Sequence, residues 1–216
     1  IGESLSEHEE EPVVAVDNFQ AGMELGRYAG NYARQHFEGN ASLLDLTYYL
    51  ANTQLRSRGF IEGLRQSAQR IEVILSLDAQ SRFETAYQLT RDALTVHPEI
   101  NMIFTINDIT AWGAIQACID LEIDPQRLAI FTFGLEGDTM REALITGKYC
   151  PAGLAMFPEV IGPVCIEAAI AAFNREPLPD KLITPHAVLS AENLREYYHR
   201  SETGWEIQWA KLRHEH

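Results

Sequence analysis

The sequence has few of the features that mark catalysis, redox chemistry or membrane insertion. No apolar run among its 216 residues approaches the ~20 residues of a membrane span. The three cysteines, Cys118, Cys150 and Cys165, show no CxxC or metal-binding spacing, and Cys118 and Cys165 lie in apolar helical runs typical of a core. HExxH, GxSxG and P-loop motifs are absent, as is a GxGxxG following a strand. We therefore expect no enzyme activity, no cofactor and no metal site.

Basic residues are scarce. The chain has 17 Lys and Arg against 31 Asp and Glu, a formal net charge of −14. Binding to phosphate groups needs clustered Lys and Arg, so we expect no direct contact of this segment with nucleic acid or with an anionic membrane surface. The ordinary interpretation of the charge is solubility. A hydrophobic fraction of 46% and a charged fraction of 22% are typical of a soluble globular protein, with room for one large domain or two small lobes.

The two ends of the chain carry little pattern. The sequence begins with Ile1 and shows no signal peptide, which is typical of a mature form or a fragment and says nothing about export. Residues 1–11 form an acidic lead-in. Residues 201–216 form a tail with a weak helical pattern. Its last residues, 213–216, could bind metal weakly, but a frayed end is the simpler interpretation.

Between the ends, apolar strands alternate with amphipathic helices. Strands are expected at 13–16, 41–46, 71–77, 102–106, 128–133, 153–157 and 182–189, and helices at 20–37, 58–69, 82–96, 110–121, 138–146, 158–173 and 191–198. This alternation predicts an α/β fold with a parallel sheet flanked by helices on both faces. Right-handed crossovers would place the carboxyl ends of the strands on one edge. Gly22, Gly26 and Gly30 form a small-residue stripe that implies close packing of their helix on a neighbour.

The most informative polar residues stand at the carboxyl ends of these strands. Asn107 and Asp108 follow the apolar run 102–106 and precede a helix, where open α/β sheets bind ligands. An amide offers donors and an acceptor, and a carboxylate accepts hydroxyls. Such a pair suits a polyhydroxylated small molecule better than covalent chemistry.

Other candidates have two interpretations each. Arg56, expected between a strand and a helix, is either a fork of donors for a ligand or an exposed loop arginine. Asp17 and Asp108 are either ligand contacts or helix N-caps. Glu136 either accepts ligand hydroxyls or is a first-turn acid favoured by the helix dipole. Two aromatic sets are assigned to packing: Trp112, Phe131, Phe133 and Phe157 to the core, and Trp205 and Trp209 to packing or partner contacts.

Five segments in order resemble the type I periplasmic-binding-protein superfamily, which includes ribose- and galactose-type receptors and the effector domains of lac-repressor-like regulators. They are Val14-Ala-Val-Asp-Asn-Phe-Gln-Ala-Gly22, Arg56-Ser-Arg-Gly-Phe60, Thr105-Ile-Asn-Asp-Ile-Thr-Ala-Trp-Gly-Ala114, Gly147-Lys148 with Ala155-Met-Phe-Pro-Glu-Val-Ile-Gly162, and Ser190-Ala-Glu-Asn193. Each segment is weak alone, and the ordered set is specific.

The resemblance implies roles for six residues: Asp17, Arg56, Asn107, Asp108, Glu136 and Met156. Arg56 and Asn107 would contact ligand, and Asp17 would lie near the cleft. Glu136 (or Leu135) stands where the family has Asp, and Met156 where it has Gln. These two departures indicate a pocket that is larger or more apolar than a ribose site.

The resemblance also implies a domain organisation. Residues 12–157 would form the C-terminal ligand-binding lobe, 158–181 a segment returning to the N-terminal lobe, and 182–200 the final strand and helix. About the first hundred residues of such proteins, most of the N-terminal lobe, would lie outside this chain. The apolar face of 158–173 then needs cover, from a missing segment or from a homodimer.

The implied function is non-catalytic binding of a sugar-like ligand by lobe closure, as a solute-binding protein or sensor. Partners would be an ABC permease or a fused signalling module, in a periplasmic or extracellular location. One alternative is the effector domain of a lac-repressor-like, cytoplasmic regulator. Another is a small α/β hydrolase or a transferase.

Overall fold

The computed structural model describes residues 13–212, so the acidic lead-in 1–11 and the end 213–216 lie outside the described part. Its centre is a six-stranded sheet of order β3-β2-β4-β5-β6-β8. The strands are β2 (Asn40–Thr47), β3 (Arg70–Asp78), β4 (Met102–Thr105), β5 (Ala129–Gly134), β6 (Ala152–Ala155) and β8 (Ala187–Ser190). The first five are parallel, and β8 alone runs antiparallel to its neighbour β6. The predicted α/β fold is confirmed, although its edge strand runs the other way.

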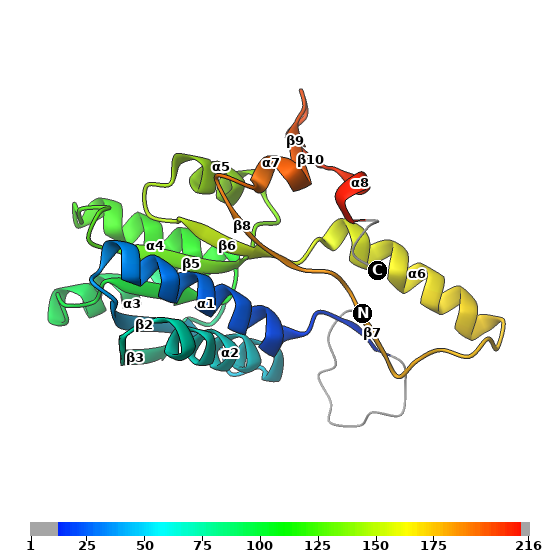
Figure 1. The fold of residues 1–216 in the computed structure, drawn as a ribbon, viewed down its shortest axis with the longest axis horizontal. Helices are drawn as coiled ribbons and strands as arrows, with labels where there is room; N and C mark the ends of the chain where they lie inside the picture. The colour runs from blue at the N-terminus through cyan, green and yellow to red at the C-terminus, as the bar shows by residue number, and fades with distance from the viewer. Residues whose placement is uncertain (1–12, 213–216) are drawn as a thin grey trace.

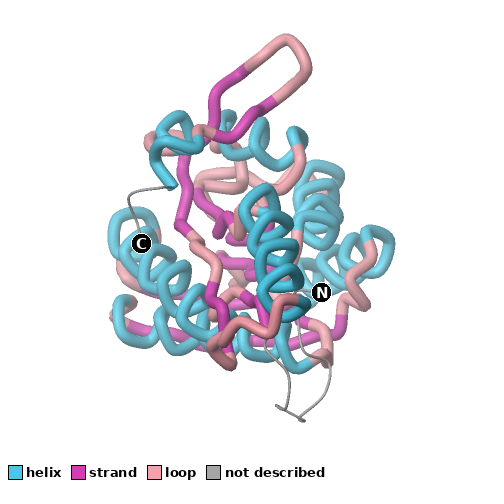
Figure 2. Tube along the Cα trace, turned by 90° about the vertical axis from the view of Figure 1, so that its right-hand side faces the viewer, coloured by secondary structure: helices cyan, strands magenta, loops and turns pink. Residues whose placement is uncertain are grey.

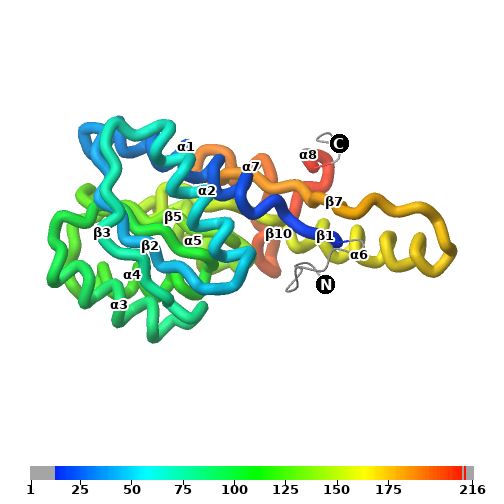
Figure 3. Tube along the Cα trace, turned by 90° about the horizontal axis from the view of Figure 1, so that it is seen from below, coloured from blue at the N-terminus to red at the C-terminus, as the bar shows by residue number. Residues whose placement is uncertain are grey.

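Helices cover both faces of this sheet (Figures 1 and 3). One face carries α1 (Asn18–His36) and α2 (Ala51–Ser67), and the other carries α3 (Phe83–Val96), α4 (Asp108–Asp120) and α5 (Asp138–Thr146). Successive strand residues point to opposite faces. Leu43, Phe104 and Phe131 therefore pack with α1 and α2, whereas their neighbours Leu44, Ile103 and Ile130 pack in the core on the opposite face.

The glycine stripe of α1 packs directly on the backbone of α2, as its spacing predicts. A Cβ added at Gly26 would lie 2.1 Å from the carbonyl oxygen of Phe60, and one at Gly22 would lie 2.5 Å from that of Arg56. Two glycines of α2 are equally crowded, because a Cβ at Gly59 or Gly63 would meet the carbonyl oxygens of α1. The first turn of α1 is thereby held against the middle of α2.

A second group of elements lies to one side of this body. β1 (Val13–Ala15) pairs in parallel with β7 (Lys181–Ile183), outside the main sheet, and the helix α6 (Pro158–Phe173) lies near them (Figures 1 and 3). The chain crosses between body and side group after β1, after β6 and after β7. No residue of α6 is buried, and Phe173 is 88% exposed. None of the helices in the described residues is both long and apolar enough to cross a membrane.

Three predicted elements are corrected by the structure. The expected strand 182–189 is two strands in different sheets, because Pro185 cannot donate to a sheet ladder and interrupts it. The expected helix 191–198 shrinks to α7 (Leu194–Tyr197). The weakly helical tail instead begins with a hairpin of β9 (Tyr198–Arg200) and β10 (Trp205–Ile207), followed by α8 (Trp209–Leu212). Gly204, at φ +140°, sits in the turn, and the hairpin projects from the helical body in Figure 2.

The expected core residues are mostly where the sequence places them. Cys118, Phe131, Phe133 and Phe157 are buried, as predicted. The prediction is wrong for Trp112, which lies on the outer side of α4 and is 37% exposed. It is also wrong for the α6 residue Cys165, which is only partly buried because no element of the described chain covers that helix fully.

The contact between α1 and α2 can be tested with Gly26→Ala. Overpacking costs about 1–3 kcal/mol, and the obstacle here is a backbone carbonyl that cannot rotate away, so the steric cost exceeds the ~1 kcal/mol that alanine adds to helix propensity. We expect the free energy of unfolding in urea to fall by about 2 kcal/mol. Gln35→Ala, on the exposed face of the same helix, should change it by less than about 0.5 kcal/mol. Equal stability of the two variants would contradict the close packing.

Candidate functional site

Arg56 is a buried charged group at the carboxyl edge of the sheet. Its Nε donates to Asn18 Oδ1 at 2.7 Å and its Nη1 donates to the carbonyl oxygen of Ile106 at 3.0 Å. Its guanidinium carbon lies 5.0 Å from the centre of the Phe133 ring. Arg56 therefore ties the start of α1 to the ends of β4 and β5.

The predicted position of Arg56 in a loop is wrong. The side chain is buried within α2, which begins at Ala51. Thr53 helps to form this early turn by donating to the carbonyl oxygens of Tyr48 and Leu50. The segment 51–57 lacks the apolar period by which helices are recognised, so the helix start was misplaced. The alternative of an exposed loop arginine is wrong as well.

Asp17 and Asn18 have different roles at the start of α1: Asp17 caps the helix, and Asn18 contacts Arg56. Asp17 is exposed and accepts from the backbone N–H of Gln20 at 2.9 Å, which confirms the N-cap interpretation. Asn18 is buried, and its Nδ2 donates to the carbonyl oxygen of Val16 at 3.2 Å. That bond fixes the Asn18 amide with its oxygen toward Arg56.

Asn107 caps α4 through its side-chain oxygen. Oδ1 accepts from the backbone N–H of Thr110 at 3.0 Å, and Nδ2 donates to the Ser81 hydroxyl. Asn107 is thus the N-cap, and Asp108 is the first helical residue.

Asp108 holds the loop that follows β5. We call residues 134–137 the Glu136 loop. The two carboxylate oxygens of Asp108 accept from the backbone N–H groups of Leu135 and Glu136, both at 2.8 Å. Burial raises the pKa of Asp108, and these backbone donors oppose the rise. Gly134 sits at φ +119°, where a Cβ would lie 2.5 Å from the Asp108 carboxylate, so only glycine fits.

Glu136 is the exposed acid of this loop. Gly137 is the N-cap of α5, so Glu136 precedes the helix and the interpretation as a first-turn acid is wrong. Partial burial raises the pKa of Glu136, the charge of Asp108 raises it further, and the charge of Arg56 lowers it. These couplings place Glu136 within electrostatic range of both groups. Leu135 is fully buried, so Glu136 is the residue that faces solvent here.

The structure thus brings most of the six predicted residues to one edge. Arg56, Asp108 and Glu136 are linked electrostatically, and Asn107 directly precedes Asp108 in the turn from β4 to α4. Asp17 adjoins Asn18, the partner of Arg56, and Met156 follows β6 and packs on the apolar core beside α1 and α2. Sequence reasoning missed Asn18 and Phe133 as the supports of Arg56. The available signal was their position in the sequence, because Asn18 shortly follows β1 and Phe133 lies near the end of β5.

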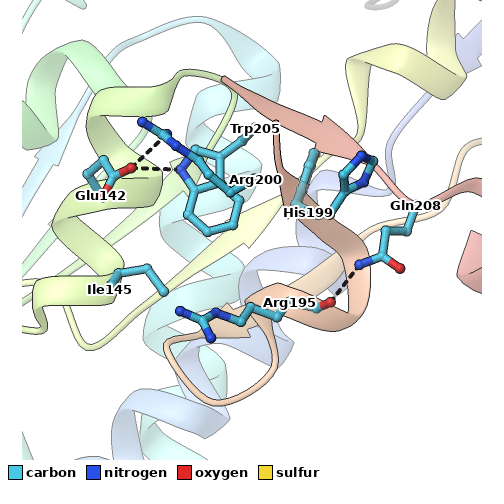
Figure 4. Close-up of a pocket in the computed structure, with 8 residues that line it drawn as sticks. Glu142, Ile145, Arg195, His199, Arg200, Trp205 and Gln208 are labelled. Atoms are coloured by element: carbon cyan, nitrogen blue, oxygen red, sulfur yellow. Dashed lines mark hydrogen bonds and ion pairs between the residues drawn. The ribbon is translucent and has the colours of Figure 1, made fainter. Parts of the chain in front are cut away.

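Two hollows in the described part of the chain lie elsewhere and contain none of these residues. One of about 470 Å³ lies between α5 and the β9–β10 hairpin (Figure 4), and one of about 320 Å³ lies between α4 and α5. In the larger hollow, Glu142 accepts from the Trp205 indole at 3.0 Å and pairs with Arg200 at 2.7 Å. Within residues 13–212, no group of three His, Cys, Asp or Glu could hold a metal ion.

The profile of the family described as periplasmic binding protein domain matches residues 4–177. The chain belongs to this family. The type I periplasmic-binding-protein superfamily, indicated by the ordered motifs, is therefore confirmed together with its mostly parallel α/β fold.

Curated relatives of this periplasmic binding protein are ribose import binding proteins. That of Salmonella typhimurium is 25% identical over 158 residues, which cover 72% of this chain and 51% of the relative. That of Haemophilus influenzae is 26% identical over 180 residues, covering 82% and 58%. The chain therefore spans about half the length of the curated relatives that it matches.

Solved structures share the fold at lower sequence identity. A periplasmic solute binding protein of an ABC transporter from Actinobacillus succinogenes, with bound D-allose, has a TM-score of 0.76 at 22% identity, covering 86% of this chain and 65% of its own. The glucose-galactose binding protein GanP of Geobacillus stearothermophilus has a TM-score of 0.75 at 23% identity, covering 85% and 63%.

The tie made by Arg56 can be tested with Arg56→Lys. Lysine keeps the charge but lacks the planar fork, so it cannot serve Asn18 and Ile106 together. One buried acceptor then loses its donor, which costs about 1–3 kcal/mol. We expect this loss in urea unfolding, with less than about 0.5 kcal/mol for Arg58→Lys, an exposed arginine of the same helix. A loss no larger than that of the control would show that the tie is weak.

Proposed function

We propose that this periplasmic binding protein domain binds a small, uncharged, hydroxylated ligand, a sugar or a sugar-like molecule, without catalysis. The observation that carries the proposal is the buried Arg56 guanidinium at the carboxyl edge, beside an exposed carboxylate at Glu136 and an amide at Asn107. Open α/β sheets bind ligands at this edge. The ribose import binding proteins among the relatives support a sugar, as do the structures named for D-allose and for glucose and galactose.

The chemistry of the edge favours hydroxyl groups. Arginine offers only donors and a carboxylate only acceptors, whereas each sugar hydroxyl can both donate and accept. A hydroxyl placed between Arg56 and Glu136 could accept a hydrogen bond from the guanidinium and donate one to the carboxylate. A strongly anionic ligand would meet Glu136 and Asp108 as well as Arg56, and these two acids disfavour it.

The remaining predicted residues take supporting roles in this proposal. Asp108 positions the Glu136 loop, since both its oxygens are already bonded there. Asp17 caps α1 with one oxygen and presents its exposed carboxylate next to Asn18. Met156 contributes apolar surface at the end of β6. Met156 stands where the family has Gln, and a thioether in place of that amide favours a pocket that is larger or more apolar than a ribose site.

Closure of two lobes is the proposed mechanism. The described body offers an open edge, and three chain crossings lead from it toward α6 and the β1–β7 pair. Ile166, Ile170 and Phe173 leave an apolar stripe on α6 without cover in the described residues. A second lobe over that stripe would complete a two-sided cleft. Ligand would then shift the population toward the closed form.

The expected partners follow from this mechanism. A closed form would be read by an ABC permease or a fused signalling module, and the names of the relatives favour import in the periplasm. Homodimer formation stays a prediction. The alternative of a regulator's effector domain has no support from the relatives named above, which are import and solute binding proteins.

The proposal is tested by titration calorimetry of the full-length protein with a panel of monosaccharides and polyols. We expect at least one aldose to bind, and Glu136→Gln to weaken it about tenfold, because a charge-assisted acceptor is lost. Glu72→Gln, on the exposed side of the edge strand β3, is the matched control and should bind as the parent does. The proposal would be overturned if no sugar gave a heat of binding in calorimetry and none raised the melting temperature.

A further inference from the structure

A second buried arginine lies behind the Glu136 loop. The Arg141 side chain, on α5, is only 3% exposed. Its Nε donates to the carbonyl oxygen of Leu135 at 2.8 Å. The loop is therefore held from two sides, by the Asp108 carboxylate on its N–H groups and by the Arg141 guanidinium on its carbonyl.

The other contacts of Arg141 come from residues far along the chain. We call residues 194–207, which contain α7 and the β9–β10 hairpin, the C-terminal segment. The guanidinium carbon of Arg141 lies 3.8 Å from the centre of the Tyr198 ring, and Nη1 donates to the carbonyl oxygen of Trp205 at 3.3 Å. A cation held over an aromatic face and away from water is attracted by the negative face of the ring. The C-terminal segment thereby fixes the direction of Arg141.

The same segment is anchored on the first two turns of α5. The backbone N–H of Trp205 donates to Asp138 at 3.2 Å, and its indole donates to Glu142 at 3.0 Å. Arg200 pairs with Glu142 at 2.7 Å, as Figure 4 shows. These contacts hold the hairpin base against the helix that carries Arg141.

The C-terminal segment also contacts the crossing into α6, residues 156–159. The Phe157 ring stacks on Tyr197 and Tyr198, with ring centres 5.5 and 6.1 Å apart. Glu159, in the first turn of α6, lies 3.4 Å from Arg141 Nη2 and accepts from the Tyr198 hydroxyl at 3.5 Å. Phe157 itself has a left-handed backbone, φ +50°, which is unusual for a bulky residue and marks the bend.

We infer that Arg141 is a positioning residue, which the C-terminal segment holds so that the Glu136 loop and the crossing into α6 keep one relative geometry. The inference rests on the proposed function for its effect on ligand, because the loop presents Glu136 at the sugar edge. Arg141 touches no ligand. It sets the place of Glu136 through the Leu135 carbonyl, and movement at the crossing reaches the loop through Glu159.

The test compares variants of the full-length protein in two measurements. The first is amide hydrogen exchange of Leu135 and Glu136, which needs no ligand. The second is calorimetric affinity for the aldose that binds best. We expect Arg141→Met to speed exchange in the loop at least tenfold and to weaken binding threefold or more. Arg141→Lys, which keeps the charge and folds more safely, should show a smaller change in the same direction.

Two further variants separate positioning from general stability. Tyr198→Phe keeps the ring beneath Arg141 and should behave as the parent, whereas Tyr198→Leu should follow Arg141→Met. Tyr149→Phe loses a 2.6 Å bond to the carbonyl oxygen of Ile123, far from the loop, and should lower Tm without changing either measurement.

The outcomes are distinguishable. Loop exchange in the Arg141 variants no faster than in Tyr149→Phe would overturn the positioning role, whatever the sugar result. Faster loop exchange with unchanged sugar affinity would overturn the inference that Arg141 affects ligand binding through the position of Glu136. Faster exchange in a protein that binds no sugar would support positioning and count against the proposed function alone.

Discussion

The buried guanidinium of Arg56 is the contact on which the candidate site depends. It reaches the site because glycines let α1 and α2 approach at backbone distance, so that Asn18 comes within 2.7 Å of it. Its second donor satisfies the Ile106 carbonyl oxygen where β4 ends, and its flat face lies over Phe133 at the end of β5. A buried charge is tolerated only when it is paired and hydrogen-bonded. The position of the Arg56 charge therefore depends both on the packing of α1 against α2 and on the ends of β4 and β5.

Two acids complete this arrangement with opposite roles. Asp108 accepts from backbone N–H groups with both carboxylate oxygens and so supports the loop, while Glu136 is exposed to solvent within electrostatic range of Arg56. No residue of the apolar helix α6 is buried, as the proposed clamp requires of a helix that packs on a second lobe. An exposed apolar surface of this kind marks an interaction site, and in a two-lobed binding protein the other lobe is its natural cover.

The sequence was sufficient to predict the elements with a clear pattern of apolar residues and the polar motifs at the ends of the strands. The runs 102–106 and 128–133 became β4 and β5, and Asn107 and Glu136 follow them at the expected edge. Arg56 was misplaced because polar residues 51–57 show no helical period, although they form two turns of α2. Arg141 could not be found, since a mid-helix arginine resembles a surface residue until Tyr198 and Trp205 fold over it. The hairpin was missed because tertiary contacts, rather than local propensity, determine it.

We propose that ligand hydroxyls bind at the sheet edge that carries Arg56, Asn107 and Glu136. Two-dimensional NMR of the full-length protein, titrated with the tightest-binding aldose, tests it most directly. We expect the resonances of the Arg56 Nε–H and of the backbone amides of Asn107 and Glu136 to shift most and to saturate together. Shifts confined to the hollow beside Trp205, or to the groove between α4 and α5, would contradict it.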